Sequence, residues 1–154
     1  MTWTLHDPAQ TIAFGASLGA LLAPGDVVIL EGGLGAGKTT LTKGIACGLG
    51  VGDTITSPTF VLAHVHQGER ARLVHVDAYR LGSQLEFDDL DLDADLAESV
   101  VIVEWGQGLC EGLSDDPLLV RITPDDRDEC RSVALTGASP RWHALIASLR
   151  EAVP

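Results

Sequence analysis

The sequence predicts a single α/β domain with three layers, in which a mostly parallel central sheet carries an inserted antiparallel hairpin. Two observations support this prediction. Apolar runs typical of strands alternate along the 154 residues with the 3.6-residue spacing typical of helices. A strand-like run at 27–30 also leads directly into a glycine-rich loop. Because the length suits one folding unit and no linker or repeat interrupts the pattern, we expect one domain over residues 1–154.

A short strand and an amphipathic helix are expected at the start of the chain. The strand covers 2–5, and Asp7 followed by Pro8 is typical of a helix cap and the first helical position. The pair Pro24 and Gly25 then ends the helix. The spacing of apolar side chains predicts an inward face made of Phe14, Leu18, Leu21 and Leu22.

The next strand and helix flank the glycine-rich loop. The run at 27–30 is continuously apolar, as expected of a strand buried on both faces of a parallel sheet. The helix begins inside the loop and ends within 48–52, and its inward residues are Leu41, Ile45 and Leu49. This order of strand, loop and helix is the context in which a glycine-rich loop binds phosphate.

A β-hairpin is expected in the middle of the chain. Segments 60–67 and 70–79 alternate apolar and polar residues, and a two-residue turn containing Gly68 separates them. Three histidines lie in these segments, at positions His64, His66 and His75. Three imidazoles can bind zinc, but we expect these side chains to face solvent instead.

The rest of the chain predicts three more strands and a closing helix. The first strand covers 99–105, and the later two cover 118–122 and 131–135. The helix follows Ser139 as its cap and extends to about residue 153. The alternation of strands and helices therefore continues to the end of the chain.

The glycine-rich loop carries the strongest functional signal. Gly32, Gly37, Lys38 and Thr39 satisfy the pattern GxxxxGK(S/T), so the domain is expected to be a P-loop NTPase. Backbone N–H groups of such a loop face the phosphates, and the lysine reaches the β- and γ-phosphates. We therefore expect ATP and Mg²⁺ as ligands, with Thr39 on the metal. The nucleotide-binding residues expected from the loop are Gly33, Leu34, Gly35, Ala36, Gly37, Lys38, Thr39 and Thr40.

Two predicted strands end in a carboxylate, Asp77 and Glu104. Ligands collect at the carboxyl ends of parallel strands, so either acid can hold Mg²⁺ or orient the attacking water. Glu104 is favoured as the metal-linked acid because its strand is more continuously apolar, which leaves Asp77 to orient the water. The alternatives are that Asp77 caps a turn and that Glu104 makes a structural ion pair.

Two further residues are candidates for the same site. Thr59, in the stretch SPTF, can offer its hydroxyl to Mg²⁺ or to the γ-phosphate, unless the stretch is only a proline turn. Trp105, directly after Glu104, can cover the nucleotide base or simply pack in the core. The predicted catalytic set is Lys38, Thr59, Asp77 and Glu104.

The charge balance argues against direct contact with nucleic acid. The chain has 10 basic and 22 acidic residues, a net charge of -12, and no Lys or Arg between Arg80 and Arg121. Nucleic-acid binding draws most of its affinity from Lys and Arg that neutralise phosphates. Any role on RNA is therefore expected to run through a partner. The absence of a membrane-spanning run and of a basic start predicts a cytoplasmic protein.

An acidic segment at 86–98 invites a calcium-site hypothesis. If Asp91, Asp93 and Asp95 were ligands, Leu96 would stand where an EF-hand loop needs glycine, so we set calcium aside. We expect an acidic, partly helical surface instead. The apolar side chains expected beneath it are Leu85, Phe87, Leu90 and Leu96.

Two other classes of P-loop protein were considered. Guanine-specific GTPases recognise their base with an NKxD motif, and this chain contains no asparagine. Small-molecule kinases need an arginine-bearing lid, for which the clustered candidates are Arg70, Arg72 and Arg80. The kinase stays open as an alternative, as does a binding module that nucleotide occupancy controls without hydrolysis.

Four motifs resemble those of the bacterial TsaE (YjeE) family, the P-loop ATPase of tRNA threonylcarbamoyladenosine biosynthesis. They are LGAGKTTLTKG, TSPTFVL, HVDAYRL and VIVEWG, in this order within 34–106. The resemblance implies an ATPase that hydrolyses little alone and acts on a transferase complex of TsaD-type and TsaB-type proteins. That complex modifies the tRNA adenosine next to the anticodon.

The same resemblance assigns residues by position. It implies that Lys38 and Thr39 bind phosphate and magnesium, that Thr59 is a switch threonine, and that Asp77 and Glu104 are the two functional acids. Tyr79 and Arg80 match the family's YR pair, which we place at the partner contact. Contact with tRNA is expected to be indirect, in agreement with the acidic composition.

Overall fold

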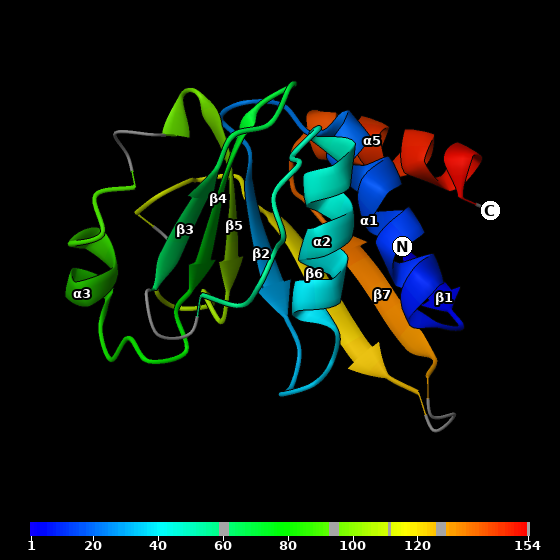
Figure 1. The fold of residues 1–154 in the computed structure, drawn as a ribbon, viewed down its shortest axis with the longest axis horizontal. Coiled ribbons are helices and arrows are strands. Elements are labelled where there is room, and N and C mark those ends of the chain that lie inside the picture. Colours follow the sequence, from blue (N-terminus) through cyan, green and yellow to red (C-terminus); the bar gives the residue numbers. More distant parts are fainter. Residues whose placement is uncertain (59–61, 93–95, 111, 126–128, 154) are drawn as a thin grey trace.

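A mixed β-sheet forms the centre of the fold (Figure 1). The computed structural model describes residues 1–58, 62–92, 96–110, 112–125 and 129–153. Within them the sheet has seven strands in the order β1-β7-β6-β2-β5-β4-β3. The strands are β1 (Thr2–Leu5), β2 (Val27–Glu31), β3 (Ala63–His66), β4 (Arg72–Asp77), β5 (Ser99–Glu104), β6 (Leu118–Pro124) and β7 (Arg131–Thr136).

The predicted α/β fold is confirmed, with a parallel core flanked by antiparallel edges. β6, β2, β5 and β4 are parallel neighbours, and β3 adds the predicted antiparallel hairpin strand beside β4. The opposite edge is antiparallel too, because β7 pairs with β6 and β1 pairs with β7. The parallel core brings the carboxyl ends of β2, β5 and β4 to one edge of the sheet.

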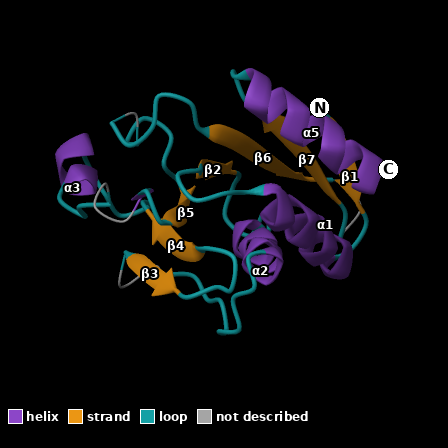
Figure 2. Cartoon of the chain, turned by 90° about the horizontal axis from the view of Figure 1, so that it is seen from above, coloured by secondary structure: helices purple, strands orange, loops and turns teal. Residues whose placement is uncertain are grey.

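Helices cover the two faces of the sheet unequally (Figure 2). The helices are α1 (Pro8–Leu21), α2 (Lys38–Gly48), α3 (Gln84–Asp88) and α5 (Pro140–Ala152). Apolar residues of α1, α2 and α5 form one core cluster with strand residues such as Leu30 and Ile102. On the other face Phe87 of α3 packs in a second cluster with Val103. None of the helices in the described part of the chain is long and apolar enough to cross a membrane.

The predicted helix caps are confirmed. Asp7 accepts a hydrogen bond from the Gln10 N–H at 2.7 Å, and Pro8 is the first residue of α1. Ser139 accepts from the Trp142 N–H at 3.4 Å at the start of α5. Each cap satisfies a backbone N–H that has no partner within its helix.

The predicted inward faces are mostly right, with two exceptions. In α1, Phe14 and Leu18 are buried, as is the C-cap residue Leu22, whereas Leu21, the last residue of the helix, is 36% exposed. In the acidic segment Phe87 is buried, but Leu85 is 75% exposed. Leu85 and Phe87 are two positions apart in the short helix α3, so their side chains lie on different faces.

The hairpin is confirmed, but its predicted turn is wrong. His66 pairs with Leu73, so the connection is longer than the two residues expected around Gly68. Gly68 instead bridges to Val51, and the Arg70 N–H donates to the Leu49 carbonyl at 3.1 Å. The hairpin tip therefore finds its backbone partners in the segment after α2, which no local pattern reveals.

Close packing of α1 against α2 sets the position of the glycine-rich loop, since α2 begins at Lys38. A Cβ added at Gly44 would lie 2.2 Å from the Ile12 carbonyl oxygen, and one at Gly19 would lie 2.3 Å from the Ile45 carbonyl oxygen. Real side chains do not approach so closely. The two helix backbones can therefore meet only because glycines line the contact.

We expect Gly44→Ala to lower the free energy of unfolding by about 1–3 kcal/mol, because the helices must separate to admit the methyl group. Alanine is otherwise favoured over glycine inside a helix by roughly 1 kcal/mol, so a loss identifies the packing contact. Denaturant unfolding monitored by circular dichroism measures the change. Gly52→Ala, in the segment after α2, is the control for a glycine without a close contact, since a Cβ there meets no atom within 4 Å. Equal stability of the Gly44 variant and wild type would contradict the contact.

Candidate functional site

A cavity of about 450 Å³ lies between the loop that follows β2, the start of α2 and the carboxyl ends of β4 and β5. The predicted loop supplies one wall, and the ends of β4 and β5 supply the other. The lining residues are Leu34, Gly35, Ala36, Gly37, Lys38, Thr39, Thr40, Ser57, Asp77, Tyr79, Glu104 and Trp105. The structure thus brings residues from distant parts of the sequence to one cavity.

Two positions of the loop have backbone conformations that favour glycine. Gly35 and Gly37 have φ angles of 74° and 108°, a region that side-chain-bearing residues rarely adopt. Gly37 is also the N-cap of α2, and its carbonyl accepts from the Leu41 N–H at 2.9 Å. The loop therefore curls directly into the helix amino terminus, which is a favourable place for an anion.

Arg131 contacts the loop from outside the cavity through a hydrogen bond. Its Nε donates to the Ala36 carbonyl at 2.9 Å, and its Nη1 donates to the Cys130 carbonyl at 2.8 Å. Arg131 lies on β7, far from the loop in sequence, and the sequence analysis did not identify it. Because a trans peptide points its C=O and N–H in opposite directions, this contact turns the Gly37 N–H away from Arg131.

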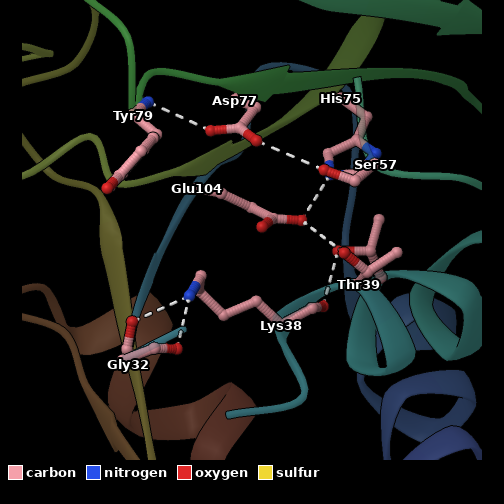
Figure 3. Close-up of polar contacts among 10 residues, drawn as sticks. Gly32, Lys38, Thr39, Ser57, His75, Asp77, Tyr79 and Glu104 are labelled. Atoms are coloured by element: carbon pink, nitrogen blue, oxygen red, sulfur yellow. Dashed lines mark hydrogen bonds and ion pairs between the residues drawn. The ribbon is translucent and has the colours of Figure 1, made fainter. Parts of the chain in front are cut away.

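Lys38 is buried at the centre of the site, with 5% exposure (Figure 3). Its ammonium donates to the carbonyls of Gly32 at 2.7 Å and Gly33 at 3.0 Å, and lies 4.1 Å from the centroid of the Trp105 ring. Burial lowers the pKa of Lys38, and the charges of Glu104 and Asp77 partly oppose that shift. Two carboxylates therefore help to keep this lysine charged.

Glu104 ends β5 and is 4% exposed. Its Oε1 accepts from the Thr39 hydroxyl at 3.2 Å, and the His75 Nε2 lies 2.8 Å from the same oxygen. Thr39 and Glu104 are 65 positions apart in sequence, and both were predicted as metal ligands. The fold places these two predicted ligands in direct contact.

Asp77 ends β4 and is paired in register with Glu104. Its Oδ1 accepts from the Tyr79 N–H at 3.0 Å, and its Oδ2 accepts from the Ser57 hydroxyl at 3.2 Å (Figure 3). The turn-capping alternative considered from the sequence therefore fits the geometry. The carboxylate still lines the cavity at 5% exposure, so the cap also fixes its position there.

Trp105 lies on the phosphate-loop side of the cavity. Its φ of 61° is unusual for a residue with a side chain, and its ring lies against the Lys38 ammonium. The ring centroids of Tyr79 and Trp105 are 5.1 Å apart. In this structure Trp105 covers the lysine, and the predicted contact with a nucleotide base stays a prediction. Thr59 lies outside the described residues.

The histidines do not behave as a solvent-facing group. His75 is fully buried and His66 is 8% exposed, so the expectation for these two is wrong, while His64 is half-buried. Alternation along a strand shows which side chains share a face, but not which face is covered. Within the described residues no group of three or more His, Cys, Asp and Glu side chains could hold a metal ion.

The donor set fits magnesium in a nucleotide site. Mg²⁺ prefers oxygen ligands and is usually held by one or two carboxylates together with substrate phosphates and water. The Thr39 hydroxyl and the Glu104 carboxylate are oxygen donors of this kind, 3.2 Å apart beside the loop. A complete protein cage, which the described residues lack, is not needed for such a site.

Comparisons with known proteins agree with these features. The family model described as "Threonylcarbamoyl adenosine biosynthesis protein TsaE" matches residues 5–133. A protein of that name from Streptomyces coelicolor is 54% identical over 134 residues, covering 83% of this chain and 90% of the relative. One from Bacillus subtilis is 37% identical over 150 residues, covering 97% and 93%. The crystal structure of Bacillus subtilis YdiB superposes with a TM-score of 0.82 at 32% identity, covering 100% of this chain and 96% of that one.

Proposed function

The chain belongs to the TsaE family, and from this premise we propose that it is a Mg²⁺-dependent ATPase required for tRNA threonylcarbamoyladenosine biosynthesis. The observation that carries the proposal is the cavity in which Lys38, Thr39, Asp77 and Glu104 converge. In this proposal the enzyme cleaves ATP to support the transferase complex and does not modify the tRNA itself.

Each side chain has a role that its position supports. The N–H groups of 34–40 and the amino terminus of α2 bind the phosphates, and Lys38 exchanges its carbonyl contacts for phosphate oxygens. Thr39 and Glu104 would hold Mg²⁺, which neutralises phosphate charge when it is bound. Asp77, fixed by Ser57 and the Tyr79 N–H, orients the attacking water.

The partner is proposed to be a transferase complex of TsaD-type and TsaB-type proteins in the cytoplasm. The net charge of -12 disfavours direct binding of tRNA, so the contact with tRNA is indirect. Tyr79 is 62% exposed at the rim of the cavity, and Arg80 beside it is exposed as well. These two residues are therefore placed to contact a bound partner beside the ATP site, so that the contact can depend on whether ATP is bound.

We expect ATP turnover to rise by about 10-fold or more when the transferase complex is added, equivalent to at least about 1.4 kcal/mol of barrier. A partner bound at the rim would exclude water from the open cavity and complete the site. Release of inorganic phosphate, measured with and without the complex, tests this. Transfer of labelled γ-phosphate to a metabolite would favour the kinase, and repeated modification with a nonhydrolysable analogue would favour a binding module.

A further inference from the structure

His75 is a fully buried titratable side chain to which the proposed mechanism gives no role. It lies on β4 between β3 and β5, and its register partner on β5 is the apolar residue Ile102. Its Nε2 lies 2.8 Å from Glu104 Oε1, closer than the Thr39 hydroxyl at 3.2 Å. A polar ring at this depth is stable only if it is hydrogen-bonded, so Glu104 is the reason it is tolerated.

The geometry determines where the imidazole carries its proton. A metal-binding carboxylate only accepts hydrogen bonds, so the proposed role of Glu104 on Mg²⁺ places the shared hydrogen on Nε2. The other ring nitrogen, Nδ1, is buried and makes no hydrogen bond among the described residues. The ring therefore makes one polar contact there, and that contact is directed at a candidate metal ligand.

The contact controls the direction of the carboxylate. Oε1 receives both the Thr39 hydroxyl and the His75 Nε2–H, whereas the second oxygen points away from these two donors (Figure 3). If Thr39 turns to a bound metal, its contact with Glu104 is lost and His75 alone keeps the carboxylate from rotating. Partners of this kind orient metal ligands in many proteins.

We propose that His75 is a positioning residue that holds Glu104 Oε1, so that the second carboxylate oxygen stays available to the Mg²⁺ of the bound nucleotide. The proposal rests on the proposed function and adds a residue to it. A purely structural histidine would contribute to folding alone. A positioning histidine would also affect how much Mg²⁺ strengthens the binding of the nucleotide.

The test compares two substitutions in the full chain. His75→Gln keeps a donor, because its amide nitrogen occupies nearly the place of Nε2, whereas His75→Met has similar length and no donor. Isothermal titration calorimetry with a nonhydrolysable ATP analogue, with and without Mg²⁺, measures how much the metal strengthens binding. We expect His75→Met to reduce this Mg²⁺ enhancement by about 10–100-fold and to leave the metal-free affinity unchanged.

The glutamine variant is expected to keep the enhancement of the wild type. His64→Met is the matched control, since His64 is the cross-strand partner of His75 and its ring lies beside that of His66, with centroids 6.0 Å apart. A folded His75→Met protein with wild-type enhancement would overturn the proposal, as would a glutamine variant that behaves like methionine. Failure of the wild type to bind the analogue at all would instead count against the proposed ATPase.

A second measurement covers the case in which His75→Met does not fold. Nitrogen NMR of the wild-type histidine rings distinguishes the two tautomers, and comparison with His75→Gln assigns the His75 signal. We expect the Nε2–H form, both alone and with Mg²⁺ and the analogue. A ring protonated only on Nδ1 could not donate to Glu104 and would rule the proposal out.

Discussion

Lys38→Met is expected to lower the affinity for ATP by about 100-fold or more. A charge-assisted hydrogen bond contributes roughly 1.5–3 kcal/mol, and this ammonium can make two of them to the phosphates. Methionine fills nearly the same space but offers neither charge nor donor. Because methionine also leaves the Gly32 and Gly33 carbonyls without this donor, we expect the variant to be folded but somewhat less stable than the wild type.

Calorimetric titration with ATP measures the affinity, and thermal unfolding checks that the variant is folded. Lys43→Met is the matched control, since Lys43 is the only other lysine and lies exposed on the same helix one turn later. The control is expected to bind ATP as the wild type does. Equal binding by both lysine variants would show that the cavity beside the loop is not the nucleotide site.

Glu104→Gln is expected to lower ATP turnover by about 100–1000-fold, the usual effect of removing one electrostatic contact that stabilises the transition state. Glutamine has the same shape, and its carbonyl oxygen can still accept from Thr39 and His75. The substitution therefore removes the charge and leaves the hydrogen bonds. Metal-free affinity for the nucleotide should stay within a few-fold, because the loop and Lys38 are untouched.

Turnover is measured as phosphate release with the partner complex present. Glu31→Gln is the matched control, because Glu31 ends the neighbouring strand β2 but pairs with Arg121 at 3.0 Å and does not line the cavity. We expect that control to retain full turnover. If both glutamine variants were equally active, Glu104 would be a structural residue, the alternative that the sequence left open.

Most of the fold could be predicted because its elements have local signals. Asp7 and Ser139 cap helices through contacts that lie within three residues, so a short sequence window contains both partners. The predicted hairpin turn was wrong because its contacts are not local in sequence. Its backbone partners are Leu49 to Val51, a segment that sequence periodicity does not connect to it.

The residues of the candidate site also divide into those with a local sequence signal and those without one. Lys38 and Thr39 belong to a contiguous pattern, and Asp77 and Glu104 follow apolar runs, so each is recognisable alone. Arg131 carries no such signal, and His75, although it begins the motif HVDAYRL, was expected to face solvent. The importance of His75 depends on Glu104 beside it, and that of Arg131 depends on the Ala36 carbonyl, contacts that exist only once the strands have assembled.

The sequence by itself determined the α/β fold, the phosphate-type loop and the family of this chain, because each is encoded in short stretches with a defined spacing. The tertiary structure alone decided which side chains meet: that Thr39 and His75 share one oxygen of Glu104, that Lys38 lies beneath Trp105, and that α1 and α2 touch through glycines. The physical reason is that register, face and close approach depend on the packing of distant segments, and local propensity does not contain that information.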